Sequence, residues 1–168
     1  MKTIRISDDS GFLGVIDPDR YVSFLSAHWD FFRLRAHILR QMLDRSILLF
    51  ATGLEGDWRV SVRMGISNVD GFRQLIGAVN ATSGRLCLVN YEMLSMAAQF
   101  HDVSIPEPFM QHCLIELPPG NYRCRIVQMF DPGDTDAAEE SREFDFLMEL
   151  EPSEPADSVW TEIGWWTA

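Results

Sequence analysis

The sequence predicts an α+β domain, mainly an antiparallel β meander or sandwich with an N-terminal helical segment and a second short helix. Several segments alternate apolar and polar residues with a period of two, and turn-forming residues separate them. Two other stretches carry apolar residues at three- and four-residue spacing. The chain has 168 residues, of which 46% are hydrophobic, so we expect a single domain, 1–168, with one continuous core.

The first helical stripe follows Asp17-Pro18, an N-cap residue followed by a proline at the first helical position. Apolar side chains then recur at helical spacing, at Tyr21, Leu25, Trp29, Phe32, Ala36, Leu39 and Leu43. We therefore expect a helix over this stretch, with a break near Ser26-Ala27-His28. The second, short helix is predicted over 91–100, before Pro106 and Pro108 impose an irregular connection.

Turn residues divide the middle of the chain into three predicted hairpins, each made of two strand-like segments around a short turn. The paired segments are 46–51 with 58–64, 72–81 with 85–91, and 114–117 with 122–126. The third has the clearest signal, because Pro118-Pro119-Gly120-Asn121 forms its turn and the second strand alternates strictly.

A last strand is predicted near the C-terminus, with one apolar and one acidic face. Its apolar face holds Phe144, Phe146, Met148 and Leu150, and its acidic face holds Glu143, Asp145, Glu149 and Glu151. If this strand pairs with 122–126, Arg123 and Arg125 lie across from its carboxylates. We then expect part of the acidic surface to be matched inside the protein.

The net charge of −11 is concentrated in one region. Residues 1–130 hold 13 basic and 13 acidic residues, whereas residues 131–168 hold 12 acidic residues against the single base Arg142. Such a region repels nucleic-acid phosphates and anionic membranes and attracts basic protein surfaces. This distribution argues against direct nucleic-acid binding and favours a basic protein partner.

The sequence shows neither a membrane anchor nor a disulfide framework. No apolar run approaches the roughly 20 residues that span a bilayer, and the first nine residues lack the apolar segment of a signal peptide. Three cysteines, Cys87, Cys113 and Cys124, cannot all pair within one chain. We expect reduced thiols packed in the core and a cytoplasmic location.

Catalytic and metal-binding chemistry has few candidates, and we expect no metal and no other cofactor. His112 lies next to Cys113, but adjacent strand residues point to opposite faces, which disfavours a Cys-His nucleophile. Zinc ligands would have to come from a scattered set, Cys87, His101, His112, Cys113 and Cys124. Calcium could be held by Asp131, Asp134 and Asp136, although a solvated turn explains the same residues and the EF-hand spacing is absent.

The segment Leu117-Pro118-Pro119-Gly120-Asn121-Tyr122, the alternating strand after it, the acidic loop and the strand 144–150 together resemble a known arrangement. They are similar to the C-terminal hairpin of the competence nuclease inhibitor family and, more loosely, to small cytoplasmic immunity proteins of bacterial toxin systems. The resemblance covers about the last third of the chain. It implies a non-enzymatic inhibitor that binds a toxin or nuclease.

The leading hypothesis is therefore a cytoplasmic binding protein that neutralises a basic toxin or nuclease through its acidic C-terminal face. Tryptophan is enriched at binding hot spots, and one lies among the acids of this segment. The predicted contacts are Asp134, Asp136, Glu139, Glu140, Asp157, Trp160 and Glu162.

Three other interpretations stay open. The first is a small enzyme or ligand-binding domain whose pocket uses His101, Asp102 and His112 for acid-base chemistry. The second is a homo-oligomer that buries its aromatic end. In the third, the acidic segment only keeps the protein soluble and Trp165 or Trp166 packs onto the core.

Overall fold

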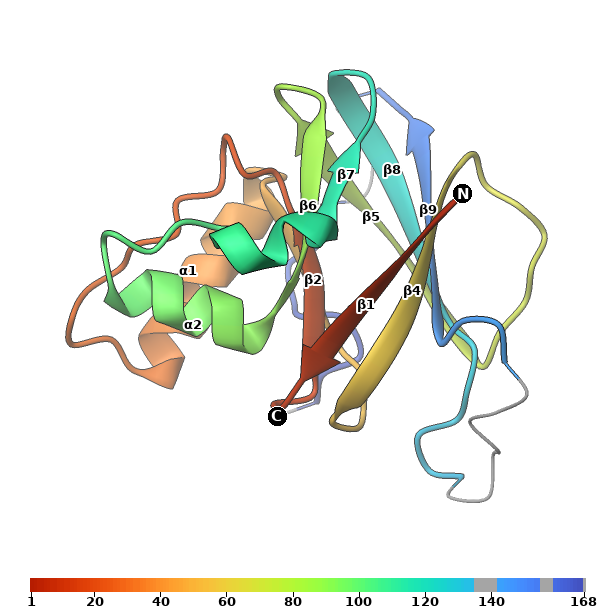
Figure 1. The fold of residues 1–168 in the computed structure, drawn as a ribbon, viewed down its shortest axis with the longest axis horizontal. Coiled ribbons are helices and arrows are strands. Elements are labelled where there is room, and N and C mark those ends of the chain that lie inside the picture. Colours follow the sequence, from red (N-terminus) through yellow and green to blue (C-terminus); the bar gives the residue numbers. More distant parts are fainter. Residues whose placement is uncertain (135–141, 155–158, 168) are drawn as a thin grey trace.

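A computed structural model describes residues 1–134, 142–154 and 159–167. The chain forms two β-sheets that enclose a shared core, with its helices gathered at one side (Figure 1). The strands are β1 (Lys2–Asp8), β2 (Phe12–Ile16), β3 (Ile47–Ala51), β4 (Gly56–Met64), β5 (Arg73–Ala81), β6 (Arg85–Asn90), β7 (Leu114–Glu116), β8 (Gly120–Gln128) and β9 (Phe146–Pro152). The helices are α1 (Phe31–Leu43), α2 (Tyr91–Gln99) and the 3-10 helix η1 (Pro108–Cys113).

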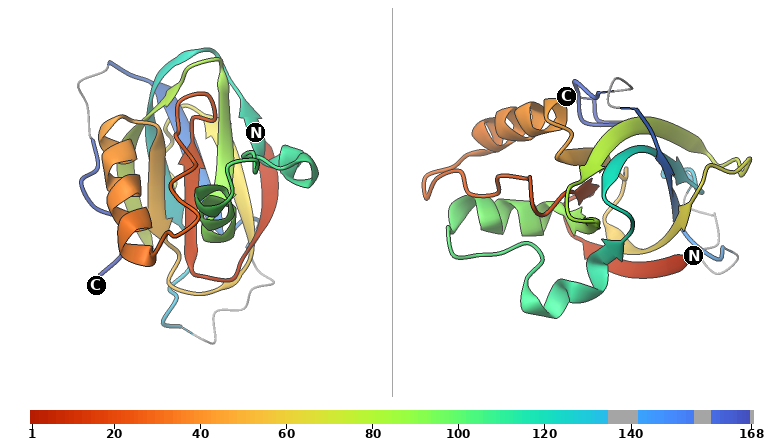
Figure 2. Two further views of the ribbon diagram at one scale, coloured as in Figure 1. Left: turned by 90° about the vertical axis from the view of Figure 1, so that its left-hand side faces the viewer. Right: turned by 90° about the horizontal axis from the view of Figure 1, so that it is seen from above.

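The five-stranded sheet has the order β1-β4-β9-β8-β5, and the four-stranded sheet has the order β3-β2-β6-β7. All pairs are antiparallel except β4 with β9, which is parallel. Seen from above, the two sheets curve around one interior and the helices lie outside it (Figure 2). These features confirm the predicted α+β class with mainly antiparallel sheets. In the described part of the chain, no helix is long and apolar enough to cross a bilayer.

The three predicted hairpins are wrong as pairings, although all six of their segments contain strands. In each case the short turn carries the chain from one sheet to the other: β3 to β4, β5 to β6, and β7 to β8. The consecutive strands that do pair are β2 with β3, β6 with β7, and β8 with β9, and they are joined by long connections. Alternation and turn residues locate strand ends, but they do not distinguish a turn within one sheet from a turn between two sheets.

The N-terminal helix begins at Phe31, not after Asp17, so this prediction is also corrected. Asp30 is its N-cap and accepts a hydrogen bond from the Arg33 N–H at 2.8 Å. The segment before it is irregular because tertiary contacts replace the helical hydrogen bonds: the N–H groups of Leu25 and Ser26 both donate to Ala98 O, at the end of α2.

Asp17 is buried and serves a different turn. Its Oδ2 accepts hydrogen bonds from the backbone N–H and the hydroxyl of Thr82, at 2.9 and 2.6 Å. This side chain therefore fixes the turn between β5 and β6.

The second helix is confirmed as α2, whose N-cap Asn90 accepts a hydrogen bond from the Met93 N–H at 2.8 Å.

Candidate functional site

The loop after β8 carries the densest group of carboxylates, and we call residues 131–143 the acidic end. Its described part begins with a turn in which Asp131 Oδ1 accepts a hydrogen bond from the Gly133 N–H at 2.8 Å. The backbone carbonyl of Asp131 accepts another from the Asp134 N–H at 3.1 Å. Asp131, Asp134 and Glu143 are exposed. The predicted contact Asp134 therefore lies at the surface, at the start of the loop.

The acidic end is anchored where it leaves the sandwich. Pro132 packs so closely on the turn between β3 and β4 that a Cβ atom on Gly53 would lie 2.7 Å from the proline Cγ. Four other predicted contacts lie outside the described residues: Asp136, Glu139, Glu140 and Asp157.

Four carboxylates of the C-terminal quarter bind arginines of the same chain. The pairs, with their N–O distances, are Arg125–Glu149 at 2.7 Å, Arg59–Asp145 at 3.1 Å, Arg142–Asp145 at 3.4 Å, Arg35–Glu162 at 3.1 Å and Arg123–Glu151 at 3.8 Å. The register places Arg123 across from Glu151 and Arg125 across from Glu149, which confirms the predicted cross-strand matching. Because these arginines already bind carboxylates, most of their charge is unavailable to the acidic end.

The Arg125–Glu149 pair is buried and holds the connection between β4 and β5 onto the outer face of the sheet. The Ser67 N–H (3.1 Å) and hydroxyl donate to Glu149, and Arg125 donates to Val69 O at 2.7 Å. Burial by itself would raise the pKa of Glu149, but the hydrogen bonds from Ser67 and Arg125 and the arginine charge lower it below its usual value. This pair is structural and is not exposed to a partner.

The C-terminal clasp, residues 159–167, contains the other two described contacts. The Trp160 indole N–H donates to Ile76 O of β5 at 2.7 Å. Its ring lies directly over Gly77, where a Cβ atom would be 2.6 Å from the indole nitrogen. Glu162 binds Arg35 of α1.

The rest of the clasp covers the open side between β3 and β5. Gly164 bridges to β3, because Ala51 N–H donates to Gly164 O at 2.8 Å and Gly164 N–H donates to Leu49 O at 2.9 Å. The Trp165 ring packs on Phe50, and both Trp165 and Trp166 contact the core. The expectation that one of these tryptophans packs onto the core is confirmed for both.

The predicted contacts that lie among the described residues thus occupy two regions of the structure. Asp134 lies at the acidic end, whereas Trp160 and Glu162 belong to the clasp and have partners within the chain. As contacts for another protein, all three stay predictions.

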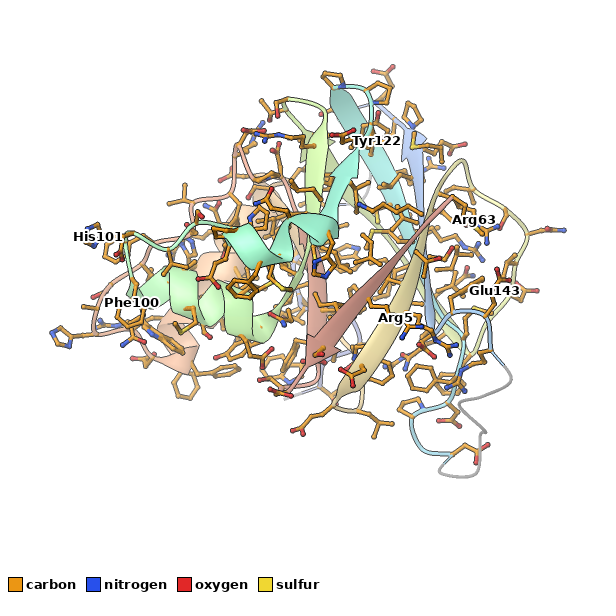
Figure 3. The ribbon with its side chains drawn as sticks, viewed as in Figure 1. Arg5, Arg63, Phe100, His101, Tyr122 and Glu143 are labelled. Atoms are coloured by element: carbon orange, nitrogen blue, oxygen red, sulfur yellow. The ribbon has the colours of Figure 1, made fainter. Side chains whose placement is uncertain are left out.

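The histidines of the alternative pocket contact different elements. His101 stacks edge-on with Phe24, with ring centroids 6.0 Å apart, and lies at the helical end of the molecule (Figure 3). A ring nitrogen of His112 lies 3.1 Å from Arg5 O on β1. Two clefts of about 540 and 550 Å³ are lined by other residues. No contact in the described chain therefore supports a shared His101, Asp102 and His112 site.

His112 and Cys113 do meet, which corrects the expectation that they would face apart. They end η1, not a strand, and the thiol lies 3.6 Å from the His112 Nε2. However, Cys113 is buried, and burial raises its pKa to about 11. A thiol with this pKa is protonated near neutral pH and is a poor nucleophile. All three cysteines are free and buried, as predicted.

The metal candidates do not assemble in the described part of the chain. There, no group of three or more His, Cys, Asp and Glu side chains could hold a metal ion. The calcium hypothesis for Asp131 and Asp134 also involves Asp136, which lies outside this part.

Comparison with known proteins shows likeness in fold only. No family model and no curated protein matches the chain. A solved structure described as crocagin biosynthetic gene J matches 90% of this chain and 96% of its own, with a TM-score of 0.60 and 18% identity. ComJ from Bacillus subtilis, an inhibitor of the DNA degrading activity of NucA, matches 91% of this chain and 96% of its own, with a TM-score of 0.53 and 10% identity. The likeness in fold therefore extends over about nine-tenths of the chain, not only its last third.

Proposed function

We propose that this chain is a non-enzymatic binding protein that neutralises a basic toxin or nuclease through its acidic end. The observation that carries the proposal is the location of its charge. Six acidic residues lie within 131–143, and the only arginine of this loop, Arg142, binds Asp145. The likeness in fold to ComJ, which inhibits a nuclease, also supports an inhibitor function.

The proposed mechanism is occlusion of a site that normally holds phosphate. Carboxylates of the acidic end would take the place of phosphates at the cationic surface of the partner. Their long-range field would accelerate the encounter, and salt would weaken this effect. Asp134, Asp136, Glu139 and Glu140 are the proposed primary contacts, with Asp157, Trp160 and Glu162 extending the surface along the clasp. The proposal places the complex in the cytoplasm.

The alternative of a small enzyme has no comparable support. Its histidines contact different elements, and the buried thiol beside His112 has a raised pKa. A homo-oligomer built on the aromatic end has less support now that the three tryptophans of the clasp contact the core of their own chain.

The first experiment is affinity capture from lysate of the source organism with the tagged full chain, at low and at high salt. A loop variant replaces the four acids by amides: Asp134→Asn, Asp136→Asn, Glu139→Gln and Glu140→Gln. A matched control makes the same change in charge at exposed acids elsewhere: Asp44→Asn, Asp70→Asn, Asp102→Asn and Glu116→Gln.

We expect wild type and control to retain one stoichiometric basic protein at low salt, and the loop variant to lose it. The captured protein should carry a nuclease or other toxin activity that the wild-type chain inhibits. Retention by the loop variant, or the absence of any basic partner at low salt, would contradict the proposal.

A further inference from the structure

A cleft of about 540 Å³ lies on the outer face of the five-stranded sheet, away from the clasp. It forms where β1 and β4 pair and where the chain enters β9. Polar side chains of Arg5, Ser7, Asp57, Arg59 and Asp145 line it. In Figure 3, Arg5, Arg63 and Glu143 lie on this side of the molecule, while Phe100 and His101 lie at the opposite end. Its volume lies in the range of about 300–1,000 Å³ that is usual for ligand sites.

Two arginines face each other across the strands of this cleft. Arg5 of β1 and Arg59 of β4 are direct partners in the antiparallel register. Like charges in this position disfavour the pairing of the strands, so they call for a compensating anion. On an otherwise strongly acidic protein, such a pair is a local exception.

Arg59 has its compensating anion within the chain, whereas Arg5 has none among the described residues. Asp145 accepts from both Nε and Nη2 of Arg59, each at 3.1 Å, and also binds Arg142. Within residues 1–134, 142–154 and 159–167, the Arg5 guanidinium has no ion pair, hydrogen bond or ring contact. Every other strand arginine in these ranges has at least one such contact: Arg59, Arg63, Arg73, Arg85, Arg123 and Arg125.

The charged side chains that line the cleft limit the charge of the anion that it can bind. Among the residues that line the cleft, Arg5 and Arg59 contribute two positive charges, and Asp145 and Asp57 contribute two negative charges. Asp57 accepts a hydrogen bond from the Ser7 hydroxyl and so has a partner of its own. Among the described residues, Arg5 is therefore the one charged side chain of the lining without an ion pair or hydrogen bond, and a single guanidinium suits a monoanion better than a polyanion such as nucleic acid.

We propose that this cleft binds the carboxylate of a small ligand or peptide, with Arg5 as the donor that recognises it. A guanidinium presents two parallel N–H groups that match the two oxygens of a carboxylate. This site adjoins the acidic end through the Arg142–Asp145 pair, but the proposal does not depend on the proposed function.

The test follows the Nε–Hε resonance of Arg5 and the backbone amides of Ser7 and Asp57 by NMR in the full chain. The probe is N-acetylglycine, added at constant ionic strength, and the uncharged N-acetylglycinamide is the ligand control. Arg5→Gln is the test variant. Arg20→Gln removes the same charge from another exposed arginine and is the matched protein control.

We expect saturable shifts with N-acetylglycine and none with the amide. Arg5→Gln should weaken binding at least about tenfold, as loss of a charge-assisted hydrogen bond does, and Arg20→Gln should leave it unchanged. Linear shifts, equal binding by Arg5→Gln, or equal shifts with the amide would overturn the proposal. Tighter binding of inorganic phosphate than of N-acetylglycine would overturn the assignment to a carboxylate.

Discussion

Asp8 is a single residue on which several loops depend. It is 1% exposed, and its carboxylate accepts hydrogen bonds from the backbone N–H groups of Ser10, Gly11 and Phe12, at 3.0, 2.9 and 3.2 Å. The Trp58 indole N–H donates to the same side chain. One carboxylate thus fixes the turn between β1 and β2 and ties it to β4.

We predict that Asp8→Ala lowers the free energy of unfolding by about 2–4 kcal/mol, because it leaves buried N–H groups without acceptors. Asp9→Ala is the matched control, since Asp9 is exposed, and it should change stability by less than about 0.5 kcal/mol. Urea unfolding of both variants tests this. Equal stability of the two would show that the Asp8 carboxylate does not hold the turn.

The two cross-strand pairs of β8 and β9 should differ strongly in their contribution to stability. Glu149→Gln removes one partner of a buried pair, so we expect a loss of about 3 kcal/mol. Glu151→Gln breaks a pair whose side chains are 40% and 46% exposed, and we expect less than about 1 kcal/mol. Denaturant unfolding at pH 7 compares them, and similar losses would contradict the difference in burial.

Stability should also depend on pH through Glu149 and Asp145, whose pKa values are both lowered in the folded state. For Asp145, burial opposes this shift, and hydrogen bonds and charge from Arg59 together with the charge of Arg142 outweigh it. A lowered pKa stabilises the fold above the unfolded-state pKa, which is about 4.3 for Glu and 3.9 for Asp. This stability is lost as the pH falls through the folded-state pKa values. The deficit of Glu149→Gln relative to wild type should therefore shrink between pH 7 and pH 3, and an unchanged deficit would refute the assignment.

On the scale of whole elements, our most specific prediction concerns the clasp. Trp160→Ala removes the indole that lies over Gly77 and its hydrogen bond to Ile76 O. We expect the clasp to open locally, so that hydrogen exchange at the Ala51 and Gly164 amides becomes at least about tenfold faster. Thr161→Ala is the control, because Thr161 is the exposed neighbour. Unchanged exchange in Trp160→Ala would mean that the clasp is held by its other contacts.

Sequence patterns predicted most of these elements but not how they pair. The strands β4, β8 and β9 follow from alternation, and the cross-strand matching of Arg125 and Glu149 follows from their register. A short turn does not show whether the two strands that it joins belong to one sheet or to two, so the predicted hairpins are wrong. The first two strands were missed, although Ile4 and Ile6 alternate with polar residues and are both buried.

Tertiary contacts explain the misplaced start of α1, because Asp17 has the sequence of a helix cap but serves the turn at Thr82. At the candidate site, the charge distribution along the sequence identified the acidic end. The position of Trp160 beside acidic residues did not show whether it contacts a partner or packs within the clasp. The Arg5 cleft was missed because it depends on which strand lies beside β1. The alternation of Arg5 with buried isoleucines was its only signal in the sequence.

On the scale of the whole molecule, the ion pairs of the sheet and the concentration of acidic residues lie in different segments of the sequence. Arginines of β4, β8 and the loop before β9 bind carboxylates on the outer face of the sheet, while six acidic residues lie in sequence at the acidic end. The clasp and the helices lie elsewhere on the sandwich (Figures 1 and 2). Under the proposed function, this concentration of acidic residues would orient a basic partner before contact.

The most direct test of the proposed inhibitor function is the rate of association with the captured partner, measured by stopped flow from about 20 to 500 mM salt, a range over which surface charges become screened. We predict that wild type and the matched control associate quickly at low salt and that their association slows steeply as salt rises. The four-amide loop variant should associate at least about tenfold more slowly at low salt, with a flatter salt dependence. Association of the loop variant at the wild-type rate and with the wild-type salt dependence would contradict the claim that the acidic end binds the partner.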